Sequence, residues 1–338
     1  MKRFLNSWGI ELTPKIRIIP YEQIRALKGI CRGTYIFSDI ERLTEEQSKL
    51  ATEVWEELSS GQKGVRLLNH PMLSMRRYQL LRTLKESGLN SFNLYRLAEE
   101  LMPKQFPVFI RVENDHRGSL TPLIRTPEEL QAVISKFSQQ GDALEDKVAI
   151  EFCDTSDEKG IFRKYSAFIV GNRIVPRHVL FSRNWVVKHP ELTDISMIRE
   201  ENHYIESNPH ERQLRKLFQM ARISYGRIDY GILNGRLQVW EINTNPNIMG
   251  SISSSIPERL GIHQFFLKHI TSAFECIDCG TNLKTLIRIS ARTRFSKTGR
   301  RTCIKWFIRD IFGFILNKIH VSNVTILSVL RQLHIFKC

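Results

Sequence analysis

Polar and apolar positions alternate most clearly along the stretch from Arg227 to Asn247, which reads RIDYGILNGRLQVWEINTNPN. The alternation runs on either side of the pair Asn234-Gly235. An Asn-Gly pair between two such runs favours a tight turn, because both residues tolerate a positive φ angle. The pattern therefore predicts a β-hairpin in which each strand has one apolar face for a core and one polar face.

The polar face of the first strand carries Asp229, and that of the second strand carries Glu241 and Asn243. Whether these faces coincide depends on the turn. A two-residue loop would set Asp229 opposite Trp240 and turn Glu241 away. A three-residue loop over 233–235 would shift the register by one residue and bring Asp229 and Glu241 onto one face, because a one-residue slip moves every side chain to the other side.

Two carboxylates and an amide oxygen on one face would need a cation to balance their charge. A set of ligands made only of oxygens suits Mg²⁺, which usually keeps waters and substrate phosphates as its remaining ligands. Asp229, Glu241 and Asn243 are therefore candidate metal ligands, and Arg227 lies beside them. For any one of these residues alone, an ordinary hairpin with an exposed polar face is the competing interpretation.

Together these residues resemble a motif of the ATP-grasp superfamily, the fold of glutathione synthetase and D-alanine–D-alanine ligase. There, an R-x-D strand and an E-x-N-x-x-P strand hold two magnesium ions against the phosphates of ATP, with Mn²⁺ as the other ion that such a site accepts. The resemblance implies that Asp229 binds one ion, Glu241 bridges both and Asn243 completes the second. It also implies that Arg227 is catalytic and faces the transferred phosphoryl group. It is looser over the rest of the span 77–255.

Two cationic positions upstream fall where ATP-grasp proteins usually have nucleotide-binding lysines. Arg77 lies near the start of a helix predicted over 75–87. Arg111 ends a strand predicted over 106–111, and the polar loop 114–119 follows it, an arrangement in which backbone amides and a side chain can cradle phosphates. Arginine keeps the charge of lysine and adds a fork that suits phosphate. The competing interpretation of Arg77 is a solvated arginine in the first turn of a helix.

The predicted strand 148–152 falls where ATP-grasp proteins have the hinge between two lobes, which binds adenine and ribose. The resemblance implies that Glu151, at this hinge, binds ATP. Glu158 lies in the following turn and is either a ribose ligand or a plain turn residue. A second hairpin is predicted over 161–180, around Gly171-Asn172.

The chain of 338 residues is long enough to bury a substantial core, and its 42% apolar and 25% charged residues are typical of a globular protein. We expect an α/β (α+β) fold with a small N-terminal domain at 1–75, an ATP-grasp domain of two lobes at 76–280 and a basic helical tail at 281–338. In the first domain, Thr44 followed three residues later by a glutamine predicts a capped helix.

Most of the net charge of +15 lies in the tail, which has twelve Lys or Arg and one Asp from residue 281 onward. The apolar positions of 303–319 predict an amphipathic helix that is too short and too charged to span a bilayer. Either it packs on the body or in a homodimer, or it makes peripheral contact with an anionic membrane surface. Nucleic acid is not favoured as a partner, because the basic run lacks interleaved aromatic residues.

Six cysteines without framework spacing and an N-terminus without an apolar run predict reduced thiols and a cytoplasmic location, with the inner membrane face as the site of any peripheral contact. The expected function is ATP-dependent ligation. A small-molecule or peptide carboxylate would become an acyl phosphate, and an amine would then displace the phosphate. The alternative is a non-catalytic nucleotide-binding protein whose basic tail binds a membrane or a partner, which the two arginines in place of lysines favour.

Overall fold

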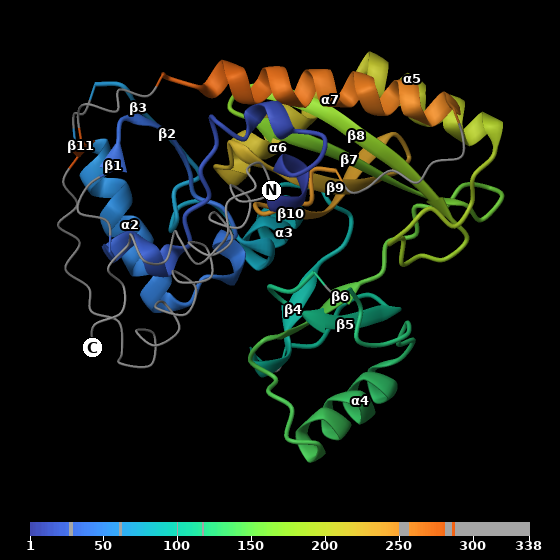
Figure 1. Ribbon diagram of the computed structural model, residues 1–338. Helices are drawn as coiled ribbons and strands as arrows, with labels where there is room; N and C mark the ends of the chain where they lie inside the picture. Colours follow the sequence, from blue (N-terminus) through green and yellow to red (C-terminus); the bar gives the residue numbers. More distant parts are fainter. Residues whose placement is uncertain are drawn as a thin grey trace, which may run out of the picture.

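The structure is a computed structural model of the chain, and it describes residues 1–26, 30–60, 63–99, 101–116, 118–249, 257–280 and 286–287. It is a mixed α/β protein, as the sequence predicts. Figure 1 shows three groups of elements: an N-terminal unit in blue, a small lobe in teal and green, and a large lobe whose sheet lies beneath the long orange helix. The helix predicted over 303–319 lies outside the described residues.

The N-terminal unit is built on a parallel pair of strands, β2 (Gly33–Ile36) and β3 (Val65–Leu68), which α2 (Glu45–Ser59) connects. The helix begins at the predicted capping box. The Thr44 hydroxyl accepts a hydrogen bond from the backbone N–H of Gln47 at 3.2 Å, and the Gln47 side chain accepts one from the backbone N–H of Thr44 at 3.0 Å. The capping box satisfies two of the open N–H donors at the start of the helix in this way.

A second pair of strands joins residues far apart in the sequence. β1 (Ile30–Cys31) pairs antiparallel with β11 (Leu286–Ile287). The Ile287 side chain is buried in the same core as Leu50 and Val54 of α2. The N-terminal unit therefore includes a strand from beyond residue 280, where the sequence alone suggested the start of a separate tail.

The small lobe is a three-stranded antiparallel sheet with one helix packed against it. The strand order is β4-β6-β5, with β4 at Leu94–Arg96, β5 at Val108–Val112 and β6 at Lys147–Glu151. The helix α4 (Pro127–Gln139) begins at a capping residue, Thr126, whose hydroxyl accepts a hydrogen bond at 3.2 Å from the backbone N–H three residues later.

The large lobe is a four-stranded antiparallel sheet in the order β10-β9-β7-β8. Its strands are the two predicted hairpins: β7 (Phe162–Val170), β8 (Arg173–Ser182), β9 (Tyr225–Leu233) and β10 (Arg236–Asn243). The two hairpins lie side by side through β7 and β9, so one continuous face runs across all four strands.

Helices cover both faces of this sheet. They are α3 (Arg77–Glu86), α5 (Ile195–Ser207), α6 (Glu211–Ala221) and α7 (Pro257–Ile277). Ala167 and Ile169 face the core shared with α5 and α6, whereas Phe168 and Val170 face the core shared with α7, which crosses the sheet in Figure 1. The remaining short elements are α1 (Lys2–Leu5) and the 3-10 turns Ile10–Leu12, Tyr21–Ala26, Ile40–Arg42 and Leu97–Glu99. Among the described residues, no helix combines the length and the apolarity needed to cross a membrane.

Candidate functional site

The turn of the β9–β10 hairpin has two residues, Asn234 with φ of 50° and Gly235 with φ of 74°. Leu233 and Arg236 pair directly on either side of it. The three-residue loop considered from the sequence is therefore wrong. Two consecutive positive φ angles are those of the tight turn whose twist matches that of the flanking strands, and an Asn-Gly pair adopts it at little cost.

A β-bulge, and not the turn, brings the polar faces of the hairpin together. Val239 pairs with Tyr230, and the next pair is Glu241 with Asp229, so Trp240 is an extra residue on β10. One extra residue shifts the register as a longer turn would have done. Asp229 and Glu241 therefore share a face, as the sequence analysis required.

The shared face continues across the whole sheet as one polar row. Glu241 of β10 pairs with Asp229 of β9, Asp229 pairs with Ser166 of β7, and Ser166 pairs with His178 of β8. The Ser166 hydroxyl donates a hydrogen bond to the Asp229 carboxylate at 2.7 Å. The large sheet thus offers a line of acceptors and donors, one from each strand.

Both carboxylates of the row form ion pairs with arginines. Arg227, two residues before Asp229, donates to the two carboxylate oxygens of Asp229 at 2.8 and 3.0 Å. The Arg77 guanidinium binds Oε2 of Glu241, and that of Arg111 lies 3.6 Å from the same oxygen. Arg77 comes from α3 and Arg111 from β5, so the small lobe, the large sheet and α3 all meet at Glu241.

The two upstream arginines also share a second acceptor. Each donates a hydrogen bond to the main-chain oxygen of Asp115, Arg77 at 2.9 Å and Arg111 at 2.8 Å. Burial lowers the pKa of Arg111 to about 10, and the charge of Arg77 adds to this shift. The two guanidinium groups therefore lie together in a desolvated part of the site. Both bind the same main-chain oxygen, which carries no full negative charge.

A histidine that the sequence analysis did not single out links this place to the N-terminal unit. His116 lies with one ring nitrogen 3.7 Å from Glu241 and the other 3.3 Å from Glu41. The contacts with Glu241 and then Glu41 raise the pKa of His116 to about 9, against the effect of burial. Burial alone would raise the pKa of Glu241, but His116, Arg77 and Arg111 hold it well below its usual value.

Glu41 also binds the hairpin motif directly. The backbone N–H of Thr244 donates to the Glu41 carboxylate at 3.1 Å, and the Thr244 hydroxyl also donates to it. The backbone N–H of Ile40 donates in turn to the Thr244 hydroxyl at 3.1 Å. No sequence pattern connects Glu41 with a residue 203 positions away, so only the tertiary structure could reveal this contact.

The predicted metal ligands fit Mg²⁺ by their chemistry, provided that other groups complete the coordination. Among the described residues, no three His, Cys, Asp or Glu side chains lie together as a metal site. Asp229 and Glu241 pair across the strands, and Asn243 lies on the same polar face, its amide oxygen accepting a hydrogen bond from the backbone N–H of Asn245 at 2.7 Å. Two carboxylates and an amide suit a magnesium ion whose other ligands are phosphates and water.

The two predicted adenosine ligands differ in burial, and their role stays a prediction. The buried Glu151 carboxylate accepts hydrogen bonds from the backbone N–H groups of Asn93 at 2.8 Å and Gln105 at 3.2 Å, and from the Tyr95 hydroxyl at 2.9 Å. These contacts tie the strands of the small lobe together. Glu158 is exposed in the turn before β7.

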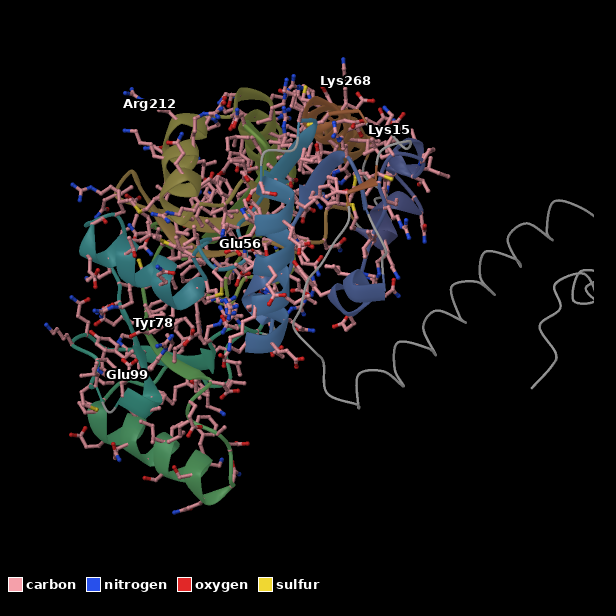
Figure 2. The ribbon with its side chains drawn as sticks, turned by 90° about the vertical axis from the view of Figure 1, so that its left-hand side faces the viewer. Lys15, Glu56, Tyr78, Glu99, Arg212 and Lys268 are labelled. Carbon is pink, nitrogen blue, oxygen red and sulfur yellow. The ribbon has the colours of Figure 1, made fainter. Side chains whose placement is uncertain are left out.

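Two cavities border the site on the side of the N-terminal unit. They have volumes of about 380 and 400 Å³, and both are lined by Arg76 and Asn114. Tyr78, labelled in Figure 2, lines the first cavity, and Glu41 and Asp115 line the second. There is thus space next to the residues that meet at Glu241.

No protein-family model matches the chain, and no curated protein sequence matches it. Among solved structures, it is similar to a D-alanine–D-alanine ligase from Bacillus anthracis complexed with ATP, with 14% identity over 80% of this chain and 88% of that one, at a TM-score of 0.45. It is also similar to an L-amino acid ligase from Bacillus licheniformis, with 12% identity over 77% and 71% of the two chains, at a TM-score of 0.37. A third is a D-alanine–D-alanine ligase from Helicobacter pylori, with 14% identity over 63% and 64%, at a TM-score of 0.35.

These similarities have TM-scores below 0.5 and identities of 12–14%, which are too low to assign a fold or a function to this chain. What the protein does has to be inferred from its own residues.

Proposed function

We propose that this protein is an ATP- and Mg²⁺-dependent ligase that activates a carboxylate for attack by an amine. The observation that carries the proposal is the convergence on Glu241 of two arginines from different elements, beside a row of oxygen ligands on the large sheet. The phosphates of a nucleoside triphosphate need fixed positive charge, and a divalent ion needs hard oxygen ligands.

Arg77 and Arg111 would bind phosphate oxygens. Both already donate to one oxygen, the main-chain carbonyl of Asp115, so their forks are arranged to share an acceptor. Asp229, Glu241 and Asn243 would hold Mg²⁺, which when bound neutralises charge on the phosphates. Arg227 holds both oxygens of Asp229 and would therefore orient this ligand as well as face the transferred group.

The reaction would proceed in two transfers. An oxygen of the substrate carboxylate attacks the γ-phosphorus of ATP, the bond to the β-phosphate oxygen breaks, and ADP leaves with that electron pair. The amine then attacks the acyl phosphate carbon, inorganic phosphate departs and the amine loses a proton. Neither transfer needs a nucleophilic side chain, so positioning and charge neutralisation supply the catalysis.

One observation favours the second candidate, a protein that binds nucleotide without turnover. Each carboxylate of the row already forms an ion pair with an arginine of the chain, Glu241 with Arg77 and Asp229 with Arg227. A site whose ligands are already neutralised has less need of a metal ion. In the ligase, Mg²⁺ and phosphates would have to compete with these contacts.

Phosphate release separates the two candidates. The full-length protein would be tested with ATP and Mg²⁺, first for nucleotide binding and then for release of inorganic phosphate, across a panel of carboxylic acids and amines. A ligase releases phosphate only when a suitable acid and amine are both present and loses this activity with EDTA. Binding without release across the panel would point to the non-catalytic protein.

A further inference from the structure

A second bulge in the large sheet presents an arginine at the other end of the polar row. Between the pairs made by Ser166 and Ala167 of β7, strand β8 has one extra residue, Arg177. A bulge re-aims a side chain, and such bulges are common beside functional sites. The Arg177 guanidinium lies over the ring of Phe266 of α7, 4.7 Å from its centre, and its Nε donates to the main-chain oxygen of Ile248 at 3.1 Å.

Arg177 has no counter-charge of its own in the part of the chain that the structure describes. Among the described residues it forms no ion pair with a carboxylate, whereas the arginines near it do. Arg227 is bound to Asp229 at 2.8 Å, and Arg259 is bound to Glu201 at 2.9 Å. The carboxylates of Asp229 and Glu201 are thus already paired with two other arginines.

The cation is also partly shielded from water. Arg177 is half-buried, and burial lowers its pKa to about 10, with Glu201 opposing this shift and the charges of Arg227 and Arg259 adding to it. The group still carries its full charge at neutral pH. A desolvated charge without a partner is unfavourable, so such a group is best explained by an anion that binds there.

Two histidines with unused ring nitrogens line the same place. Nε2 of His178 and Nδ1 of His263 are buried and have no hydrogen-bond partner within the described part of the chain. Burial, together with the charge of Arg177, holds the pKa of His178 well below its usual value and lowers that of His263 to about 4, so both rings are neutral at pH 7. Buried polar atoms are rarely left unpaired unless a ligand or water completes them.

We propose that Arg177, with His178 and His263 beside it, binds an anionic group of the substrate, either a carboxylate or a phosphate. Placing this group on a substrate rests on the proposed ligase function. β8 lies three strands from β10, or about 14 Å at the usual spacing of about 4.8 Å, so this anion is separate from the phosphates at Arg77 and Arg111. The protein therefore acts on an acidic substrate, with an anionic group besides the carboxylate that ATP activates.

Anion-dependent thermal stability tests the site directly. The melting temperature of the full-length protein would be measured against sulfate and, separately, succinate, with Mg²⁺ and a non-hydrolysable ATP analogue present to fill the phosphate site. At a hundredfold excess over Kd, bound anion should raise Tm by about 4 °C. Arg177→Gln should lose most of this shift, and Arg177→Lys should keep part of it.

Arg173→Gln is the matched control, because Arg173 lies on the same strand, is exposed and bonds only to the Ser272 hydroxyl at 3.0 Å among the described residues. It should keep the full shift. Each shift is a difference within one variant, so a change in basal stability cancels. An Arg177→Gln protein with the wild-type shift, or a wild-type protein without one, overturns the proposal. A Tm shift with sulfate but not with succinate would assign the site to a phosphate group. A Tm shift with succinate but not with sulfate would assign it to a carboxylate.

Matched acceptors connect the site to the reaction. Phosphate release would be compared for glutamate against glutamine and for aspartate against asparagine. Arg177→Gln should lower kcat/KM for the acidic member at least about tenfold and leave the neutral member unchanged, because a charge-assisted contact is lost. Equal loss for both members would contradict the inference. If the ATP analogue fails to bind at all, the ligase proposal falls, while the anion-dependent shift still decides whether this site exists.

Discussion

At the scale of single residues, the site is organised by charges that compensate one another. Glu241 faces Arg77, Arg111 and His116, and this carboxylate is the only acidic group of the motif that all three approach among the described residues. In a partly desolvated place, removing one member leaves the others uncompensated, which costs more than the pair itself contributes. Substitutions here should therefore affect stability and nucleotide chemistry together.

Glu241→Gln should abolish Mg²⁺-dependent turnover, because an amide lacks the charge that the metal ion and the arginines need. It should also lower the free energy of unfolding by about 3 kcal/mol, since three cationic groups lose their counter-charge. Phosphate release and urea denaturation measure the two effects. Glu206→Gln, at an exposed position of α5, is the control and should change neither. Normal turnover in Glu241→Gln would refute the assigned role.

Arg77→Ala or Arg111→Ala should weaken ATP binding by roughly 10–150-fold, which corresponds to the loss of a charge-assisted contact of about 1.5–3 kcal/mol. Equilibrium binding of a fluorescent ATP analogue measures this change. Arg125→Ala, at an exposed position of the same lobe as Arg111, should bind ATP as the wild-type protein does. Unchanged affinity in both site variants would remove these arginines from the nucleotide site.

The pKa of His116 predicts how stability depends on pH. Its folded-state value of about 9 lies above the ordinary value of 6.5, so the folded protein binds the proton more tightly than the unfolded chain. The resulting stabilisation is complete below pH 6.5 and is lost as the pH rises towards 9, with a slope of at most about 1.4 kcal/mol per pH unit. Urea titrations across this range should show the decline, and His116→Gln should flatten it. An equally steep decline in that variant would show that another group titrates.

At the scale of elements, two bulges shape the large sheet. The one at Trp240 puts Glu241 opposite Asp229, and the one at Arg177 lies on the opposite outer strand, next to the pair of Ser166. Both adjoin the same polar row. Because the bulges set the register of this row, the hairpin turn is left to close β9 and β10 without deciding which residues face the site.

Gly235→Ala should therefore lower stability without disturbing nucleotide binding. A residue with a Cβ is strained by about 1–2 kcal/mol at the positive φ of 74°, although no atom lies within 4 Å of the added carbon. Gly261→Ala in α7 is a matched control, since it also meets no atom but has helical backbone, and it should raise stability by up to about 1 kcal/mol. Urea denaturation measures the change in the free energy of unfolding for both variants. Loss of ATP binding in Gly235→Ala would show that the turn sets the register after all.

At the scale of the whole molecule, contacts between distant segments hold the three groups of elements around the site. Glu41 joins the N-terminal unit to the hairpin through Thr244, and β11 joins the chain beyond residue 280 to β1. Lys15 and Glu275 form a further ion pair at 3.1 Å between the first residues and the end of α7, and Lys15 is labelled in Figure 2. The N-terminal unit is therefore attached to the large lobe at several separate places.

Two truncations should separate the tail from the fold. Deleting residues 291–338 removes ten basic residues and one acidic residue, lowering the net charge from +15 to +6, and keeps β11. It should keep ATP binding and Tm but lose affinity for anionic vesicles at low salt. Deletion from residue 281 also removes the buried Ile287, worth about 2 kcal/mol, and should lower Tm. Vesicle binding by both truncations would place the membrane contact in the body of the protein.

The sequence by itself determined the local structure and the residue types of the site. The cap at Thr44, the Asn-Gly turn and the alternation in β9 and β10 all appeared where they were predicted, because each depends on neighbours a few residues away. Arg77 and Arg111 both lie at Glu241, and their assignment as nucleotide ligands stays a prediction.

Only the tertiary structure decided which groups meet. No local pattern records the Trp240 bulge, the contact between Glu41 and Thr244, the imidazole of His116 between two carboxylates or the bulge at Arg177. A bulge depends on pairing with a partner strand, and a pKa shift depends on groups brought together from several elements. Those interactions come from packing across long sequence separations, and periodicity or spacing along the chain does not record them.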